Sequence, residues 1–332
     1  MVKFGIFIQA TPARGDYEFL KKTALMCERS GFHSLWLNDH LIPLPTQEPG
    51  GSFLECWTTL SALATATRTL RLGTLCTCIS YRYPSLVAKM GATLDNISDG
   101  RFEFGIGAGW YEREYTMYGI PFPKSSVRIQ QLREGIQVIK KMWTEENPSF
   151  QGNYYRIERA INQPKPIQTP HPPILIGTVR AKSAMQKVVA EFANTWNAVQ
   201  TTLENYKQKS NMLKKECLSV GRDRNSVENS LLCTVYIAEN HGESLNRAQR
   251  FRVADPRLHT EDIFGRMRGM PVEEYAREWC ISGSPEECVE KIREYVDAGV
   301  TYFVVVFLDL DYGLNLQSLQ LFGEKVIPPF ID

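Results

Sequence analysis

Residues 97–110, ISDGRFEFGIGAGW, contain an entry turn, a strand and a glycine-rich exit in one continuous stretch. Residues 98–100 (SDG) are of the types that favour tight reversals of the chain. Apolar residues then alternate through residues 101–106, which predicts a β-strand. Residues 107–109 (GAG) follow directly, so the strand ends in backbone that a flat or anionic ligand can approach closely. A tight strand exit without any ligand explains the G-x-G pattern equally well, and the rest of the chain decides between the two.

The bulk composition shows no electrostatic preference for a charged partner. The chain has 332 residues, enough for one large domain or two ordinary ones. Its 38 Lys and Arg residues balance 37 Asp and Glu residues, which gives a net charge of +1. This balance argues against nucleic acid and against an anionic membrane surface as partners.

The sequence shows no pattern typical of a membrane span, a signal peptide or a metal site. No apolar run approaches the ~20 residues that span a bilayer. The N-terminal residues MVKFGIFIQA enter a strand-like pattern without a signal-peptide cleavage region, so we expect a cytoplasmic protein. The eight cysteines are scattered through apolar segments without a C-x-x-C pair, and we expect buried thiols and no metal site.

The order strand, loop, helix recurs along the chain. Strands are predicted at residues 2–8, 34–37, 70–79, 101–106, 174–177, 195–199, 231–238 and 302–307. Helices are predicted between Asp16 and Gly31 and at about 53–67, 84–97, 125–143, 181–192, 203–218, 284–298 and 316–324. This alternation predicts an α/β protein in which residues 1–332 form a single (β/α)8 TIM-barrel domain, with a doubly wound parallel sheet as the alternative.

Three segments depart from the simple alternation. An insertion is predicted after the fourth strand, at about residues 111–124. Residues 147–173 read as a small hairpin followed by an extended stretch with five prolines between Pro164 and Pro173. The charged segment 243–280 is expected to be helical, with a mobile or partner-contacting portion near residues 255–270.

A barrel of this kind binds its ligands at the C-terminal ends of the strands. The residues at those ends in this sequence are Gln9, Asp39, His40 and the segments 75–78, 107–110, 177–180 and 197–200. They follow six different strands, so a ligand at the mouth would contact residues far apart in the chain.

These segments resemble the bacterial luciferase-like family of flavin and deazaflavin oxidoreductases, especially its branch that depends on coenzyme F420. The motifs that carry the resemblance are LWLNDHL (35–41), the run from LRLGTLCTC to YGIPFP (70–123), the helix from Arg128 to Trp143, QPKPIQTPHPPILIG (163–177) and GSPEECVEKIREYVDAGV (283–300). The similarity covers most of the chain.

The resemblance implies a barrel mouth that holds an isoalloxazine or deazaflavin ring, with a non-proline cis peptide bond between Leu75 and Cys76. The cofactor-binding residues that it implies are Asp39, Leu75, Cys76, Cys78, Gly107, Ala108, Gly109, Gly177, Thr178, Arg180 and Ala198. Interior packing is the alternative for Cys76 and Cys78. Residues 177–180, with Lys182 and Ser183 at a helix start, suit a phosphate group, and a solvated helix start is the alternative there.

Asp39 and His40 are the predicted catalytic residues. They match the family positions that hold a ring-contacting acid and a histidine, and an imidazole can move a proton coupled to hydride transfer near neutral pH. A structural histidine is the alternative for His40. Gln9, Trp110 and Tyr111 are predicted to contact the substrate.

Two positions separate this chain from the sugar-phosphate dehydrogenases of the same family. Those relatives have a tryptophan four residues after the histidine and an acidic residue at the end of the GAGW run, where this chain has Leu44 and Trp110. We therefore expect F420-dependent hydride transfer to or from a small organic substrate other than a sugar phosphate. An FMN-dependent monooxygenase of the luciferase or alkanesulfonate type and a non-catalytic flavin-binding barrel are the alternatives, and family members commonly form homodimers.

Overall fold

The computed structural model describes residues 1–8, 16–43, 53–179, 183–254, 269–309 and 312–331. The predictions for Gln9, Arg180, Lys182, Leu44 and most of residues 255–270 fall outside these ranges. None of the described helices is long and apolar enough to cross a membrane.

Eight parallel strands close into a barrel, as the sequence predicts. In barrel order they are β1 (Lys3–Ile8), β2 (Ser34–Leu37), β3 (Arg71–Thr74), β5 (Phe102–Gly107), β8 (Ile174–Thr178), β9 (Thr195–Val199), β10 (Glu228–Ile237) and β12 (Tyr302–Phe307). β10 pairs with both β9 and β12, and β12 pairs with β1, so the circle is complete. A doubly wound sheet, which has two open edges, is thereby excluded.

Two short strands extend this barrel. The predicted third strand is split into β3 and β4 (Thr77–Cys78), and the peptide bond between Leu75 and Cys76 is cis, as the resemblance implied. β11 (Cys280–Gly283) pairs with the C-terminal half of β10. The expectation of helix up to Cys280 is therefore wrong at that residue, which begins a strand because the neighbouring β10 offers it an unpaired edge.

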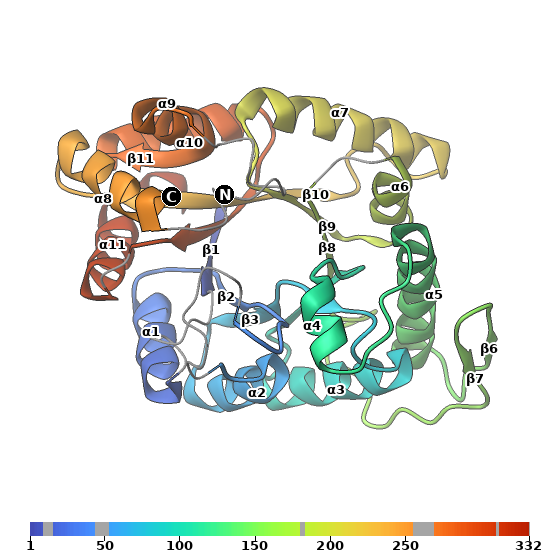
Figure 1. The fold of residues 1–332 in the computed structure, drawn as a ribbon. Coiled ribbons are helices and arrows are strands. Elements are labelled where there is room, and N and C mark those ends of the chain that lie inside the picture. The colour runs from blue at the N-terminus through green and yellow to red at the C-terminus, as the bar shows by residue number, and fades with distance from the viewer. Residues whose placement is uncertain (9–15, 44–52, 180–182, 255–268, 310–311, 332) are drawn as a thin grey trace.

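The barrel helices surround the strands, as Figure 1 shows. They are α1 (Tyr17–Arg29), α2 (Cys56–Ala66), α3 (Pro84–Ile97), α5 (Ser125–Thr144), α6 (Ser183–Phe192), α7 (Leu203–Ser219), α10 (Pro285–Asp297) and α11 (Tyr312–Lys325). Side chains cap two of these helices, since Asp16 accepts a hydrogen bond from the Glu18 N–H (2.9 Å) and Ser284 forms a capping box with Glu287.

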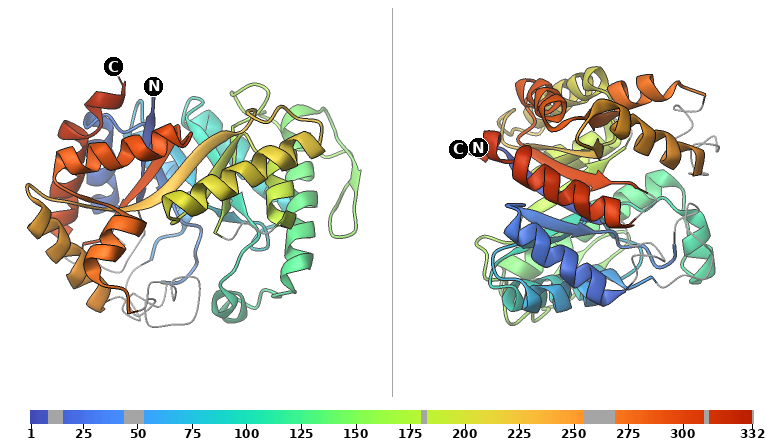
Figure 2. Two further views of the ribbon diagram at one scale, coloured as in Figure 1. Left: turned by 90° about the horizontal axis from the view of Figure 1, so that it is seen from above. Right: turned by 90° about the vertical axis from the view of Figure 1, so that its left-hand side faces the viewer.

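The remaining elements lie in the segments that the sequence marked as irregular. α4 (Glu112–Met117) follows β5, the antiparallel pair β6 (Phe150–Gln151) and β7 (Arg156–Ile157) forms the predicted hairpin, and α8 (His241–Ala254) and α9 (Val272–Trp279) follow β10. The chain ends in α12 (Pro328–Ile331), where the Val2 N–H donates to the Phe330 carbonyl (3.2 Å), so that the two termini lie together (Figure 2).

The two faces of the barrel strands contribute to two separate packed layers, one under the helices and one inside the barrel. Phe102, Phe104 and Ile106 of β5 point outward and pack under the helices, with the Phe104 ring 5.2 Å from that of Trp143. The alternate residues point into the barrel, where Trp36 of β2 is completely buried. The outer layer therefore holds helices against strands, and the inner layer fills the barrel.

Glycines on three neighbouring strands make room for the Trp36 indole. A Cβ atom at Gly5 would lie 2.9 Å from the indole nitrogen, and one at Gly73 would lie 2.3 Å from its ring. A Cβ at Gly105 would lie 1.9 Å from the Thr74 carbonyl oxygen, which is backbone and cannot turn away. The indole N–H donates to Ser34 Oγ at 2.7 Å.

We predict that Gly105→Ala destabilises the protein by about 1–3 kcal/mol, because the added methyl group forces β3 and β5 apart. The free energy of unfolding from urea titration measures this cost. Gly107→Ala is the matched control on the same strand, where the nearest atom to the added Cβ is 3.6 Å away, and its effect should stay within about 0.5 kcal/mol. Equal costs for the two variants would contradict the packing argument.

Candidate active site

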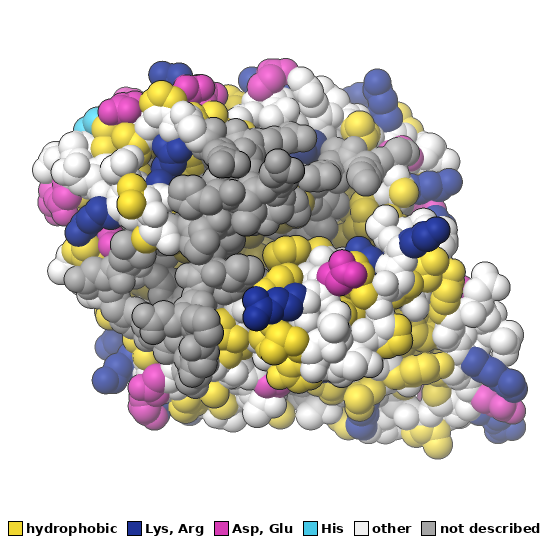
Figure 3. Space-filling model, viewed as in Figure 1, with side chains coloured by type: hydrophobic (Ala, Val, Ile, Leu, Met, Phe, Trp, Pro, Cys, Tyr) yellow, Lys and Arg dark blue, Asp and Glu magenta, His cyan; other side chains and the backbone are white. Residues whose placement is uncertain are grey.

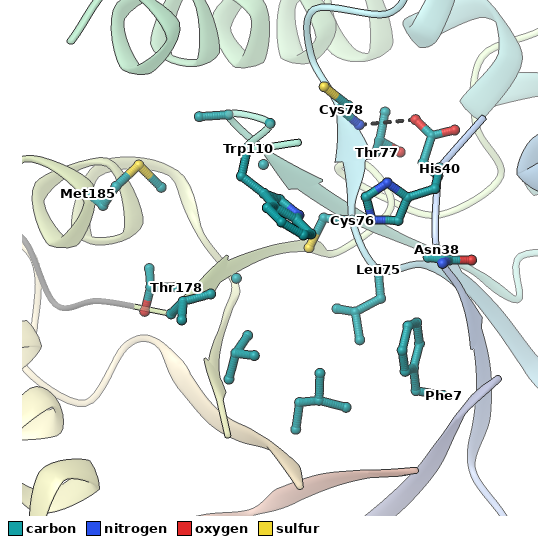
Figure 4. A pocket seen from close by; sticks show the side chains of 18 of the residues that line it. Phe7, Asn38, His40, Leu75, Cys76, Thr77, Cys78, Trp110, Thr178 and Met185 are labelled. Carbon is teal, nitrogen blue, oxygen red and sulfur yellow. Dashed lines mark hydrogen bonds between the residues drawn. The ribbon is translucent and has the colours of Figure 1, made fainter. Parts of the chain in front are cut away.

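A cavity of about 410 Å³ opens at the C-terminal ends of the strands. Figure 4 shows Asn38 and His40 on one side of it, Thr178 and Met185 on the opposite side, and Trp110 between them. Most of the predicted site residues line this cavity. They are Asp39, His40, Leu75, Cys76, Cys78, Gly107, Ala108, Gly109, Trp110, Gly177 and Thr178.

Two other predicted residues lie elsewhere. Tyr111 is not among the cavity-lining residues, but its ring is 6.1 Å from the His40 ring. Ala198 is fully buried in the outer apolar cluster, because its neighbours Asn197 and Val199 hold the inward positions of β9. A side chain with this outward direction does not reach the cavity.

Asp39 is a buried carboxylate held by a cation and a backbone amide. Its Oδ2 lies 2.8 Å from Arg82 Nη1 and accepts a hydrogen bond from the Cys78 N–H at 3.0 Å. Burial raises the pKa of Asp39 to about 6, although Arg82 and the Cys78 amide oppose the shift. Its Oδ1 has no hydrogen-bond partner among the described residues and so can receive a donor from a ligand.

His40 is oriented by a carboxylate and two aromatic rings. Its Nδ1 lies 2.9 Å from Glu114 Oε2, at the start of α4. The rings of Trp110 and Tyr111 stand nearly perpendicular to the imidazole, with the Trp110 centroid 5.8 Å away. Trp110 remains 46% exposed, so it can also contact a molecule that enters the cavity.

The thiols of the site are weak acids. Burial raises the pKa of Cys76 to about 12 and that of Cys78 to about 11. Cys78 Sγ also lies 2.9 Å from the Tyr115 hydroxyl. Both thiols therefore stay protonated at neutral pH, and packing or neutral contact is the role that their chemistry allows.

Two further cavity-lining side chains have unpaired polar atoms. The amide of Asn38 is 4% exposed, and neither its oxygen nor its nitrogen has a partner among the described residues. Arg128, in the first turn of α5, is 9% exposed and its Nε is likewise unpaired within the described chain. Buried polar groups of this kind are normally hydrogen-bonded, so a ligand that supplies the partners would fit both.

Arg128 belongs to a place that suits an anion. Its guanidinium stacks on the Phe122 ring at 3.9 Å, which fixes its direction, and Ser125 of the same helix N-terminus also lines the cavity. Gly177 and Thr178, at the end of β8, line the cavity as well. A helix N-terminus together with a buried cation favours a phosphate group.

The opposite wall of the cavity is mostly apolar, apart from Gln200, which directly follows β9. Phe7, Val199, Leu232, Val306 and Leu308 line it, and they come from or directly follow β1, β9, β10 and β12. Figure 3 shows Lys and Arg interspersed with Asp and Glu on the described surface of the face it presents, in keeping with the near-zero net charge.

Sequence reasoning did not assign Asn38, Glu114 or Arg128 to the site. Asn38 could have been found, because period-two alternation places it on the same face of the chain as Ser34 and Trp36. Glu114 and Arg128 lie in or beside the predicted insertion, and no local pattern directs them toward the strand ends. Arg128 is the first residue of the helix motif from Arg128 to Trp143. That motif indicates the family, but it does not show where the Arg128 side chain lies.

The fold and the cavity define a (β/α)8 barrel with a preformed small-molecule site at the C-terminal ends of its strands. The model of the luciferase-like monooxygenase family matches residues 2–302. The chain belongs to this family.

Comparison with curated proteins adds named relatives. The chain is 29% identical over 314 residues to the F420-dependent glucose-6-phosphate dehydrogenase of Microbacterium testaceum, an alignment that covers 92% of this chain and 90% of the relative. It is 27% identical over 330 residues to the enzyme of the same name from Amycolatopsis mediterranei, with 93% of each chain covered.

Solved structures share the fold at lower identity. An F420-dependent secondary alcohol dehydrogenase, in complex with an F420-acetone adduct, superposes with a TM-score of 0.82 at 19% identity, covering 100% of this chain and 99% of the other. The oxygenating constituent of 3,6-diketocamphane monooxygenase from Pseudomonas putida, in complex with FMN, gives a TM-score of 0.76 at 19% identity, with 99% of each chain covered.

We predict a pH-dependent effect of Asp39→Asn on stability. The folded-state pKa of about 6 lies above the ordinary value of 3.8, so the folded protein binds more protons between these two pH values. The free energy of unfolding of the wild type, relative to that of Asp39→Asn, should therefore fall by about 1–3 kcal/mol as pH rises from about 4 to 6. Above that range the difference should stay constant.

Urea titrations at intervals across this pH range, extended below the ordinary Glu55 pKa of 4.5, measure the effect. Glu55→Gln is the control, because Glu55 is the second carboxylate on Arg82 (2.6 Å) and its pKa is lowered: burial opposes the shift, and the Thr58 N–H and Arg82 outweigh it. The Glu55 carboxylate stabilises the folded protein at pH values above its ordinary pKa, and this stabilisation is lost as pH falls through the lowered pKa. The free energy of unfolding therefore rises with pH, which is opposite to the effect of Asp39. The same slope for both variants would contradict the assignment.

Proposed function

We propose that this protein is an F420-dependent oxidoreductase that transfers hydride between the deazaflavin and a small organic substrate at the barrel mouth. The observation that carries the proposal is one cavity in which Asp39 and His40 meet the unpaired groups of Asn38 and Arg128. The curated relatives, which are named F420-dependent dehydrogenases and align over about nine tenths of the chain, support it.

The polar atoms of the cavity fit such a cofactor. Asn38 offers one donor and one acceptor group, which suits the amide-like edge of a deazaflavin ring. Gly107 leaves backbone open to a flat ring, whereas the space beside the Gly109 Cα is filled by the Tyr115 hydroxyl and the Cys78 thiol. Arg128 and Ser125, with Gly177 and Thr178 at the end of β8, would hold the phosphate group. When bound, F420 supplies the carbon that accepts or gives up the hydride.

The chain's own residues would then handle protons and water. His40 lies where it can accept a proton from a substrate hydroxyl, or return one to a carbonyl oxygen, through its cavity-facing edge. Asp39 Oδ1 can accept a hydrogen bond from a cofactor or substrate group. The rings of Trp110 and Tyr111 beside His40 would shield this proton transfer from bulk water.

The walls of the cavity favour a substrate with little charge. Phe7, Leu232, Val306 and Leu308 offer apolar contact and no donor for a sugar hydroxyl. Trp110 stands where the sugar-phosphate dehydrogenases have an acid. We therefore propose an alcohol, carbonyl compound or activated alkene with a compact apolar body, and not a sugar phosphate.

A second candidate is an FMN-dependent monooxygenase, because FMN-containing proteins also share this fold. Oxygen consumption separates the two, since a monooxygenase consumes oxygen in proportion to product. A non-catalytic flavin-binding barrel remains a third candidate, which would bind a cofactor that no donor or acceptor reduces or oxidises. A cytoplasmic location and a homodimer are further proposals, and light scattering tests the dimer.

We predict that F420 binds to the purified protein and that Arg128→Met weakens this binding by about tenfold to hundredfold. A hydrogen bond to a charged group contributes about 1.5–3 kcal/mol, and 1.4 kcal/mol corresponds to a factor of ten. Fluorescence titration with F420 measures the dissociation constant. Arg133→Met is the matched control on the same helix, because Arg133 pairs with Glu191 outside the cavity, and it should leave binding unchanged.

A parallel titration with FMN tests the cofactor itself. Tight binding of FMN without any binding of F420 would overturn the proposed function. Equal weakening by Arg128→Met and Arg133→Met would leave the cofactor assignment in place and overturn the phosphate site.

A further inference from the structure

Glu114 has four hydrogen-bond partners although its side chain is completely buried. Its Oε1 accepts from the backbone N–H groups of Leu41 and Ile42, the latter at 3.2 Å. Its Oε2 faces His40 Nδ1 at 2.9 Å and accepts from the Tyr81 hydroxyl. Glu114 thereby joins α4 to the loop that follows β2, and the function proposed above gives it no role.

The protonation state of Glu114 decides what it does to His40. Burial alone would raise the pKa of Glu114, but its hydrogen bonds with His40, the Tyr81 hydroxyl and the Leu41 amide lower it below its usual range. The group is then a carboxylate, which can only accept hydrogen bonds. The proton between the two side chains consequently belongs to Nδ1 of His40.

A neutral imidazole carries one proton, so the position of that proton fixes the chemistry of the other nitrogen. With Nδ1 donating to Glu114, Nε2 on the opposite edge of the ring keeps a free lone pair. Nε2 has no partner among the described residues, and His40 lines the cavity. The opposite tautomer would place two acceptors, Nδ1 and the carboxylate, against each other at 2.9 Å.

We propose that Glu114 is a positioning residue that holds His40 as the Nδ1–H tautomer and so presents Nε2 to the cavity as a proton acceptor. The role of His40 in proton transfer rests on the proposed function. In the oxidation of an alcohol, Nε2 would take the hydroxyl proton as the C=O bond forms, and bound F420 would supply the acceptor for the hydride that the same carbon loses. The reduction runs the same transfers backward, with Nε2 returning the proton.

The other charged and titratable groups near His40 in the described part of the chain leave this pairing undisturbed. Asp39 directs Oδ2 to Arg82 and the Cys78 amide. Arg82 is further held by Glu55 at 2.6 Å. Tyr81 donates to Glu114, and Tyr111 contacts the imidazole through its ring, so neither offers a competing acceptor to Nδ1.

The test reads the tautomer directly in the protein without cofactor. Protein labelled with 15N-histidine is examined by long-range 1H–15N NMR at a pH about two units above the ordinary histidine pKa of about 6.5, where neutral imidazoles dominate. His40→Gln assigns the His40 signals by their disappearance. We expect His40 of the wild type to show the Nδ1–H pattern. An Nε2–H pattern in the wild type would overturn the proposal.

Glu114→Gln is the decisive variant because glutamine has nearly the shape of glutamate but can donate a hydrogen bond to His40 Nδ1. The glutamine oxygen can keep the Leu41 and Ile42 amides, which places its NH2 group opposite His40 Nδ1. His40 should then change to the Nε2–H tautomer. Tyr81→Phe removes the other partner of the same carboxylate oxygen and should leave the Nδ1–H tautomer in place. The His33 signal, from the opposite end of the barrel, serves as the internal reference.

Kinetics and binding separate this proposal from the function on which it rests. If the protein turns over with F420, Glu114→Gln should lower kcat by about a hundredfold or more while KM and F420 affinity change little. An unchanged tautomer in Glu114→Gln contradicts the positioning role even if F420 binds. A changed tautomer in a protein that binds no F420 supports the positioning role and contradicts the proposed function.

Discussion

The packing of one indole, that of Trp36, sets the geometry of the barrel interior. Small residues on both sides let this ring lie across strands β1, β2, β3 and β5, since a Cβ at Gly5 or Gly73 would overlap it. Below it a polar chain continues from Ser34 to the Tyr302 hydroxyl (2.6 Å) and on to the buried Glu103 carboxylate (3.1 Å). Because a barrel interior is close-packed, the shape and the hydrogen bonds of this layer together determine how β12 meets β1 and β2.

A filled interior leaves the space at the C-terminal ends of the strands as the place for a ligand. There the chain places two carboxylates in different settings. Asp39 is paired with a cation and has a raised pKa because burial outweighs Arg82, whereas Glu114 is surrounded by donors and has a lowered pKa. Neighbouring acids whose pKa values are shifted in opposite directions are typical of functional sites.

The two sides of the cavity differ in their chemistry. The side formed by β2, β4, β5 and β8 carries the polar and glycine residues that the family resemblance implied. The side formed by β9, β10, β12 and β1 is mostly apolar, with Gln200 as a polar exception, whereas Trp110 stands beside His40. The proposed function assigns the polar side to the cofactor and the apolar side to the substrate.

The sequence by itself determined the alternation of strands and helices, the closed-barrel class and the position of the cis bond, because side-chain periodicity and family motifs are local in the chain. It also located Asp39, His40 and the glycines at strand ends. Only the tertiary structure decided which side chains meet. His40 and Glu114 are 74 residues apart, and Asp39 and Arg82 are 43 apart. Ala198 points outward while its neighbours point inward. These side-chain contacts depend on strand register and on where an insertion folds back over the barrel. A local sequence pattern determines neither.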